Sequence, residues 1–519
     1  MTDYAAEARK DTLDKDLDKL VHVEEATSFV ARGLVAPGLS LLFLAMSAIV
    51  ASFFVMGEPG AVVIIAAAAI GGYMALNIGA NDVANNVGPA VGAKAMTMGG
   101  ALAIAAVFES AGALIAGGDV VVTISSRIVD PLAVPDSGAF IRLMLAALIS
   151  SALWVNLATW VGAPVSTTHA VVGGVVGAGI VAAGLAAIDW ASIAGIAASW
   201  VISPLLGAIV AALFLAFIKA AVIYQDDKIA AARRWVPLLI ALMAGAFAAY
   251  LATKGLKRVI NLSGLQIALL GVGIFGLVWG MTKVSVRRQS EGMDNRNQSL
   301  RRLFHLPLIC SAALLSFAHG ANDVSNAVGP LAAIVHAASG DSSPTISIPL
   351  WVMVIGAFGI SLGLVLFGPK LVRMVGEQIT KLNPMRAFCV ALSAAITVIV
   401  ASWFGLPVSS THIAVGAIFG VGFFREWYTA NSRRRRAYLE RKVERLRAER
   451  QMSTSVEIVE EAESGDLESD GPPISREEVN RRKLVRRAHV TTIVTAWVTT
   501  VPAAALLAAA IFLLLDALA

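Results

Sequence analysis

The sequence is poor in charged, aromatic and cysteine residues. Only 15% of its 519 residues are Asp, Glu, Lys or Arg, whereas 57% are hydrophobic and the mean hydropathy is +0.74. Soluble domains are about one-quarter charged, so this composition excludes an ordinary soluble protein and predicts a chain that crosses the membrane many times. The two cysteines, Cys310 and Cys389, lie in apolar runs and indicate neither a disulfide nor a metal site.

The charges that are present gather in loops beside the apolar runs. The loop 283–302 contains Lys283 and five arginines, which is typical of a cytoplasmic loop. Such loops account for the net charge of +5 without a nucleic-acid partner. Lys254, with its basic neighbours Lys257 and Arg258, is an exception, because the predicted topology places it outside. Residues 1–33 carry charges of both signs and no apolar core, so they are not a cleavable signal peptide.

An eleven-residue polar stretch occurs twice in the otherwise apolar sequence. Gly79–Pro89 reads GANDVANNVGP and Gly320–Pro330 reads GANDVSNAVGP, with nine of eleven positions identical at an offset of 241 residues. A repeat this specific indicates an internal duplication. Each copy places an aspartate, Asp82 or Asp323, at membrane depth, where polar groups are costly and usually functional.

A second pair of motifs supports the duplication and divides the chain. Pro164–His169 reads PVSTTH and Pro407–His412 reads PVSSTH. The predicted division is a cytoplasmic N-terminal tail (1–33), an extra N-terminal transmembrane helix (34–56), a first repeat (61–220), a linker with two transmembrane helices and cytoplasmic loops (221–302), the first part of a second repeat (303–425), a charged cytoplasmic insert (426–489) and a final transmembrane helix of the second repeat (490–519).

The predicted fold is an all-α polytopic membrane protein with about 12–13 membrane segments. Gly79–Pro89 is so rich in glycine and amides that we expect the helix to break there, and residues 120–124 are strand-like. Traced from the cytoplasmic loop 283–302, the chain enters the second aspartate stretch from inside and the first from outside. The sequence therefore predicts two inverted-topology repeats with broken helices or re-entrant hairpins, and a substrate site near the midplane between them.

The four motifs offer an anion hydroxyl groups, amides and helix ends, but no Lys or Arg. Broken helices present free N–H groups and positive dipole ends. The hydroxyls belong to Ser166, Thr167, Thr168, Ser409, Ser410 and Thr411, and the amides to Asn81, Asn85, Asn322 and Asn326. Such a site suits a tetrahedral oxyanion that must be released again, because an arginine clamp would hold it tightly.

The two aspartates would oppose a bare anion. Two carboxylates facing a phosphate in a low dielectric repel it by several kcal/mol if all remain charged. They become favourable if each holds a cation or a proton, or accepts a hydrogen bond from a protonated phosphate oxygen. The sequence therefore predicts cation-coupled uptake, and Na⁺ would find oxygen ligands at Asn81, Asp82, Asn322 and Asp323.

These motifs resemble the signature motifs of the inorganic phosphate transporter (PiT) family, over residues 61–425 and 490–517. The resemblance implies a symporter of inorganic phosphate with Na⁺ or H⁺ in the cell membrane, built as a homodimer and working by alternating access without a further cofactor. It implies phosphate contacts from Asp82, Asn85, Ser166, Thr167, Asp323, Asn326, Ser409 and Ser410. It assigns Asn81, Thr168, Asn322 and Thr411 to cation sites or to shaping the turns.

Glu109 resembles a functional intramembrane glutamate of the family and is predicted to take part in cation coupling. Alignment of the halves through Ser110 and Ser361 pairs it with Ile360, so a second carboxylate is absent. The N-terminal helix 34–56 and the insert 426–489 resemble additions to the family core.

Other functions compatible with the motifs are transport of sulfate or of a metal–phosphate complex, an anion channel and, last, a membrane enzyme. Paired aspartates disfavour an anion pore, and the motifs contain no convincing set of nucleophile, base and orienting group. His169 and His412 are either proton relays or turn residues that bond the backbone.

Overall fold

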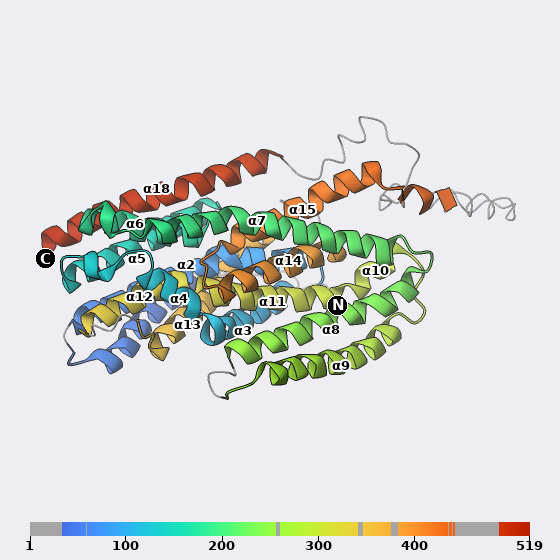
Figure 1. Ribbon diagram of the computed structural model, residues 1–519, viewed down its shortest axis with the longest axis horizontal. Coiled ribbons are helices and arrows are strands. Elements are labelled where there is room, and N and C mark those ends of the chain that lie inside the picture. The colour runs from blue at the N-terminus through green and yellow to red at the C-terminus, as the bar shows by residue number, and fades with distance from the viewer. Residues whose placement is uncertain are drawn as a thin grey trace, which may run out of the picture.

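Helices make up nearly all the regular structure of the chain (Figure 1). The computed structural model describes residues 34–58, 60–163, 165–255, 260–340, 346–374, 382–433, 435–438, 440–441 and 487–519. Within these ranges the β contact is limited to an isolated bridge between Val129 and Ile188. The all-α prediction is confirmed. The predicted tail 1–33 and most of the insert 426–489 lie outside the described residues.

The first half begins with the N-terminal helix Leu34–Val55 and continues through six further α-helices. These are α2 (Ala61–Gly92), α3 (Met98–Ala116), α4 (Gly118–Ser126), α5 (Ser137–Val161), α6 (Thr167–Ala183) and α7 (Trp190–Ile218). A π-helical turn follows α7. The linker comprises α8 (Lys228–Lys254), α9 (Gly264–Gln289) and α10 (Asn297–Leu303), and α8 and α9 lie against each other.

The second half contains six further α-helices among the described residues. It comprises α11 (His305–Asp323), α12 (Ser325–Ala338), α13 (Leu350–Met374), α14 (Pro384–Trp403), α15 (Ser410–Asn431) and α18 (Arg487–Leu518). In the described residues ten helices are long and apolar enough to cross a membrane, or eleven if the bent run from α10 to α12 is one span. This number is below the predicted 12–13, partly because α6, with 17 residues, is too short to be counted.

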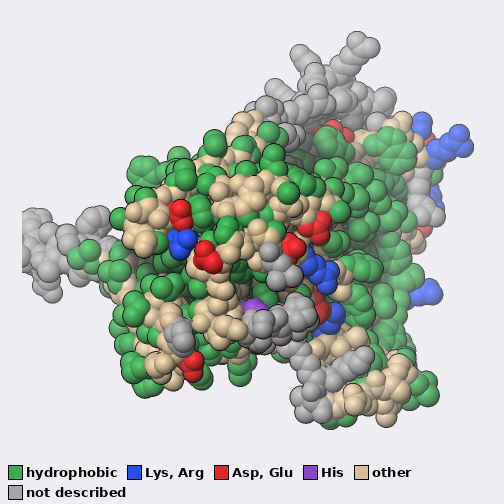
Figure 2. Space-filling view, turned by 60° about the vertical axis from the view of Figure 1, so that its left-hand side comes forward, with side chains coloured by type: hydrophobic (Ala, Val, Ile, Leu, Met, Phe, Trp, Pro, Cys, Tyr) green, Lys and Arg blue, Asp and Glu red, His purple; other side chains and the backbone are tan. Residues whose placement is uncertain are grey.

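The apolar runs form helices because a helix satisfies its own backbone hydrogen bonds in lipid. Large hydrophobic side chains remain exposed along several helices, including Leu265, Leu269 and Val272 on α9. Figure 2 shows hydrophobic side chains over most of one face, with the Lys, Arg, Asp and Glu side chains in a few places. Such a surface is expected of a protein whose outer helices contact lipid tails.

The expected break at Gly79–Pro89 was wrong, because α2 runs through it without interruption. Asparagines usually disturb a helix by bonding its backbone. Here Asn85 donates to Thr411 and Asn86 to Glu109, so these amides are satisfied by neighbouring segments and leave the helix backbone intact. In the second copy α11 and α12 are separated only at Val324, whose φ of −56° and ψ of −30° remain helical.

The strand-like reading of residues 120–124 was also wrong, since they lie within α4. Val121 and Ile124 are buried and are three residues apart, which places them on one helical face. Ile124 meets Gly329 of α12, where a Cβ added to the glycine would lie 2.8 Å from the isoleucine side chain. Packing against a neighbouring helix therefore outweighed the β-propensity of these residues.

The two halves interlock through equivalent helix pairs. α2 lies against α13 and α3 against α11, while α7 lies against α15 and α18 against α6. In each central pair glycines bring backbones together: a Cβ on Gly79 would lie 1.9 Å from the Ile360 carbonyl oxygen, and a Cβ on Gly320 would lie 2.1 Å from that of Glu109. Gly79 and Gly320 are repeat counterparts, so the same contact is made twice.

Candidate substrate and cation site

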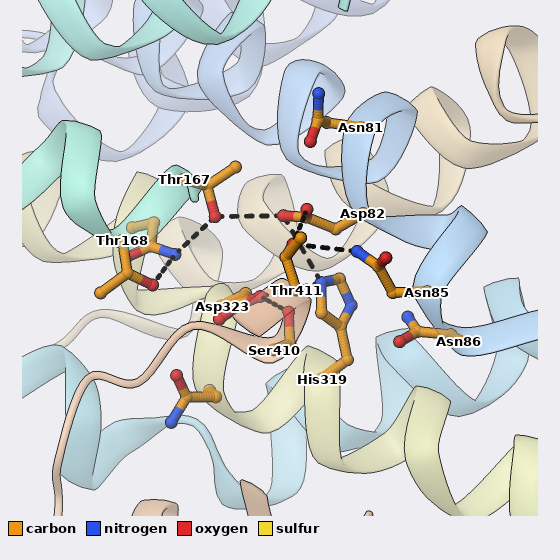
Figure 3. Close-up of polar contacts among 12 residues, drawn as sticks. Asn81, Asp82, Asn85, Asn86, Thr167, Thr168, His319, Asp323, Ser410 and Thr411 are labelled. Carbon is orange, nitrogen blue, oxygen red and sulfur yellow. Dashed lines mark hydrogen bonds and ion pairs between the residues drawn. The ribbon is translucent and has the colours of Figure 1, made fainter. Parts of the chain in front are cut away.

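Two buried carboxylates, one from each half, form the centre of the site. Asp82 lies on α2 and Asp323 at the end of α11, and each is 1% exposed. Asp82 accepts hydrogen bonds from Thr167 (3.1 Å) and Thr411 (2.9 Å), and Asp323 accepts one from Ser410 (2.8 Å) (Figure 3). The duplicated motifs therefore meet in space, and each half contributes to the surroundings of Asp82.

The N-termini of α6 and α15 reach this centre. Thr167 is the first residue of α6 and Ser410 the first of α15, so the hydroxyls that bind the aspartates stand at positive helix ends. Ser166 and Ser409 are the N-caps, and their hydroxyl oxygens accept from the backbone N–H of the residues three positions later. N-cap residues such as these fix the direction in which a helix begins. The predicted PVS(T/S)TH motifs are thus helix starts.

Two asparagines reach from the aspartate motif of one half to the hydroxyl motif of the other. Asn85 Nδ2 donates to Thr411 Oγ1 at 2.9 Å. Asn326 Nδ2 lies 3.2 Å from both Thr167 Oγ1 and Thr168 Oγ1. Because Asn85 and Asn326 are counterparts, and so are Thr168 and Thr411, the crossing is reciprocal. The halves form one site between them.

Asn81 and Asn322 stand beside the turns that precede α6 and α15. The Asn322 amide donates to Ser402 Oγ (2.9 Å) and to the Leu406 carbonyl (3.1 Å), and its oxygen accepts from the Val408 N–H (3.2 Å). Asn81 lies 2.9 Å from the Thr159 hydroxyl, the counterpart of Ser402. The bonds of Asn322 hold the turn that precedes α15, and a cation role for Asn322 stays a prediction.

Glu109 lies next to the centre, and so does a histidine that sequence reasoning missed. Asn86 Nδ2 donates to Glu109 Oε1 at 2.7 Å. His319, which is fully buried, has Nε2 2.9 Å from Asp323 Oδ2 and 3.9 Å from Asp82 Oδ2, and Nδ1 3.4 Å from Glu109 Oε2. The signal was present in the sequence, because His319 precedes Asp323 by four residues and therefore shares its helix face.

Several buried polar atoms of this cluster have no hydrogen-bond partner within the described structure. They are the oxygens Asn86 Oδ1, Glu109 Oε2, Asp323 Oδ1 and Asn326 Oδ1 and the two ring nitrogens of His319. One ligand atom each from Asp82, His319 and Asp323 lies within 4.8 Å of the others. Carboxylate and amide oxygens are the ligands that hard cations prefer. The residues therefore fit a bound cation.

The histidines of the PVS(T/S)TH motifs lie beside the site and face each other. The ring centroids of His169 and His412 are 4.4 Å apart, and the ring of Trp200 contacts His169 edge to face at 3.8 Å. Ser166 is bonded to the backbone N–H of His169, whereas the imidazole faces His412 and Trp200. This arrangement differs from a hydrolase, in which the imidazole itself activates the hydroxyl.

A comparison with known families identifies the chain. Residues 78–508 match the model of the phosphate transporter family. The chain belongs to this family. The transporter is 47% identical over 526 residues to the Helicobacter pylori protein named "Putative phosphate permease", with 96% of this chain and 98% of that protein covered. A Chlamydia muridarum protein of the same name is 40% identical over 387 residues, which cover 70% of this chain and 90% of that one.

A solved structure is also similar to the transporter. It is described as "The sodium-dependent phosphate transporter", with a TM-score of 0.73 and 31% sequence identity, over 88% of this chain and 100% of that chain. The family membership and the apolar helices confirm that this is a multi-pass membrane transporter and not an enzyme.

Proposed function

We propose that the chain carries inorganic phosphate across the cell membrane together with a cation, and that Na⁺ is the coupling cation. The observation that carries this proposal is the pair of buried aspartates, Asp82 and Asp323, held between hydroxyl groups at two helix N-termini. The sodium dependence named for the similar solved structure supports Na⁺ over H⁺.

Charge balance explains why uptake of the anion should require the cation. Two ionised aspartates and a phosphate of about one to two negative charges bring three to four negative charges together. Each helix N-terminus contributes only about half a positive charge, so α6 and α15 offset about one of them. Bound cations supply the remaining positive charge, and phosphate binds poorly until they arrive.

We propose that the predicted site residues form two groups. Hydroxyls and amides beside the helix N-termini, from Ser166, Thr167, Asn85 and their counterparts Ser409, Ser410 and Asn326, are proposed to bind phosphate oxygens. The Asp82 and Asp323 carboxylates, with Thr168 and Thr411, are proposed to hold the cation and to meet protonated phosphate oxygens. Asn81 and Asn322 are proposed to fix the turns beside them.

The proposed mechanism is alternating access about a site shared by two inverted repeats. The reciprocal packing of α7 on α15 and of α18 on α6 supports it, because equivalent helices then surround the site from opposite ends of the sequence. The homodimer remains a prediction, and cross-linking of the protein in membranes tests it.

Uptake of labelled phosphate into proteoliposomes under separate Na⁺ and H⁺ gradients tests the proposed function. We expect accumulation above equilibrium under an inward Na⁺ gradient and none without a cation gradient. Accumulation driven by an H⁺ gradient alone would show that H⁺, and not Na⁺, is the coupling ion. Flux without accumulation would refute coupled transport and favour a channel.

Competition experiments distinguish the substrates left open by the sequence. We expect excess sulfate to leave phosphate uptake unchanged, and a chelator of divalent metals to have no effect. Inhibition by sulfate would favour a broader oxyanion transporter, whereas loss of uptake with the chelator would favour a metal–phosphate complex.

A further inference from the structure

The two aspartates of the site have different hydrogen-bond donors, although the motifs around them are repeated. Asp82 accepts one bond from the hydroxyl of its own half, Thr167, and one from the opposite half, Thr411. Asp323 accepts the equivalent bond from Ser410. The counterpart of Thr411, however, is Thr168, and its hydroxyl donates to the Val408 carbonyl at 3.0 Å. Asp323 therefore lacks the second hydroxyl donor that Asp82 has.

His319 lies against Asp323 as well, but at Oδ2, the oxygen that already accepts from Ser410, while Oδ1 accepts no hydrogen bond in the described structure. Its Nε2 lies 2.9 Å from Asp323 Oδ2 and also faces Asp82 Oδ2 at 3.9 Å, so one ring stands between carboxylates from the two halves (Figure 3). The ring is completely buried and lies on the same helix, four residues before Asp323. Neither ring nitrogen makes an aligned hydrogen bond, so the ring meets these carboxylates in buried ion-pair contacts, and removing one partner from such a contact is costly.

Glu109 fixes the other side of the histidine ring. Its Oε2 lies 3.4 Å from His319 Nδ1, and its Oε1 accepts from Asn86 Nδ2 at 2.7 Å. The helices carrying the two residues are in close contact, because a Cβ on Gly320, next to His319, would lie 2.1 Å from the Glu109 carbonyl oxygen. The backbones of α3 and α11 are therefore in contact directly beside the two side chains.

The repeat-equivalent positions carry apolar residues instead of this polar set. The repeat offsets that pair Asp82 with Asp323 and Ser110 with Ser361 also pair His319 with Ile78, Glu109 with Ile360 and Asn86 with Ala327. Gly79, beside Ile78, packs against the Ile360 carbonyl just as Gly320 packs against that of Glu109. The backbone contact is therefore made at both Gly79 and Gly320, whereas the polar set of Asn86, Glu109 and His319 accompanies only the contact at Gly320.

We propose that His319 is a positioning residue of the transport site, which holds Asp323 beside Asp82 through its contacts with both carboxylates and is itself oriented by Glu109. The inference rests on the proposed function. Glu109 then acts on the cation and phosphate site through the histidine. The two aspartates are therefore unequal. The position of Asp323 depends on His319 and Glu109, whereas the position of Asp82 depends on the hydroxyls of Thr167 and Thr411.

The test measures phosphate uptake by purified protein in proteoliposomes, with the midpoint of Na⁺ activation, the KM for phosphate and the maximal rate. His319→Ile copies the residue of the other half and removes the donor, and His319→Gln keeps an N–H donor. His305→Gln, at the start of the same helix and outside the carboxylate cluster, is the matched control. We expect about a tenfold or larger loss of uptake efficiency for His319→Ile, partial recovery in His319→Gln, and no change in the control.

Coupling to Glu109 is measured with the double variant. If Glu109 acts through His319, the combination of Glu109→Gln with His319→Ile lowers uptake no further than His319→Ile alone. Additive losses would overturn the inference, and so would a His319→Ile protein with the wild-type Na⁺ midpoint and phosphate KM. Should His319→Ile fail to fold, His319→Gln decides: a raised Na⁺ midpoint at an unchanged melting temperature supports the inference, and an unchanged midpoint refutes it.

The two proposals fail in different ways. If the wild-type protein takes up no phosphate, the proposed function is refuted. If the wild-type protein is active and the His319 variants behave like the His305 control, only the positioning role of the histidine is refuted.

Discussion

Substitution of Gly320 by alanine should damage both stability and transport. The new Cβ would lie 2.1 Å from the Glu109 carbonyl oxygen and 2.7 Å from its carbonyl carbon and Cα. Because these are backbone atoms, no side chain can turn aside. Relief to an ordinary contact of about 3 Å requires α3 and α11 to separate by roughly 1 Å, which is the scale at which overpacking costs about 1–3 kcal/mol.

This cost is partly offset by helix propensity, since alanine is favoured over glycine in a helix by about 1 kcal/mol. The functional loss should be larger, because Gly320 adjoins His319 and stands three residues before Asp323. A separation of roughly 1 Å would lengthen the 3.4 Å contact between His319 Nδ1 on α11 and Glu109 Oε2 on α3, and so release the ring that lies against Asp323. We therefore expect a lowered melting temperature and at least about a tenfold loss of phosphate uptake in proteoliposomes.

Two further glycines make the comparison decisive. Gly280 on α9 has no atom within 4 Å of an added Cβ, so Gly280→Ala should keep wild-type uptake and a melting temperature that is equal or higher. Gly79→Ala, the counterpart of Gly320→Ala, should be at least as damaging, because its Cβ would lie 1.9 Å from the Ile360 oxygen. Wild-type melting and uptake in Gly320→Ala would refute the close backbone contact.

Three other substitutions address the site. Asp82→Asn should abolish cation-driven accumulation of labelled phosphate while leaving the protein folded, because it removes a buried charge; retained accumulation would contradict the assignment of Asp82 to coupling. Thr411→Val should raise the Na⁺ midpoint about tenfold through loss of the bond to Asp82, and Thr411→Ser should restore it; equal midpoints would argue against that contact. Asn322→Ala should lower the melting temperature by leaving the Val408 N–H unbonded, at a cost of about 1–3 kcal/mol, whereas Asn431→Ala at an exposed helix end should not.

The sequence alone identified the membrane class, the duplicated motifs and the two aspartates, because each leaves a local and repeated signal. Asp82 and Asp323 stand out as charges in apolar runs, and the same motif occurs beside both. The reciprocal contacts of Asn85 and Asn326 are a different matter. They depend on how α2 and α12 face α15 and α6, which no pattern within one segment encodes.

The errors in the prediction share one physical cause. Asparagines in α2 and β-branched residues in α4 were judged by their effect on an isolated backbone, whereas in the folded chain their side chains contact other helices. His319 was missed for a related reason. A comparison of the two halves identifies Asp323, because its counterpart is also an aspartate. The same comparison does not identify His319, because its counterpart, Ile78, is apolar.

The packing of α18 on α6 determines the order in which the protein can be completed during synthesis. Gly173 and Gly177 on α6 pack against the backbone of Val501 and Ala505, where an added Cβ would lie 2.6 and 2.2 Å from the respective carbonyl oxygens. About 330 residues separate Gly173 from Val501, so at translation rates of roughly 5–20 residues per second α6 waits about 16–66 seconds for its partner. During that interval Gly173 and Gly177 lack the α18 backbone that covers them in the complete chain. A chain that ends before residue 487 therefore holds both aspartates but not the helix that packs on α6.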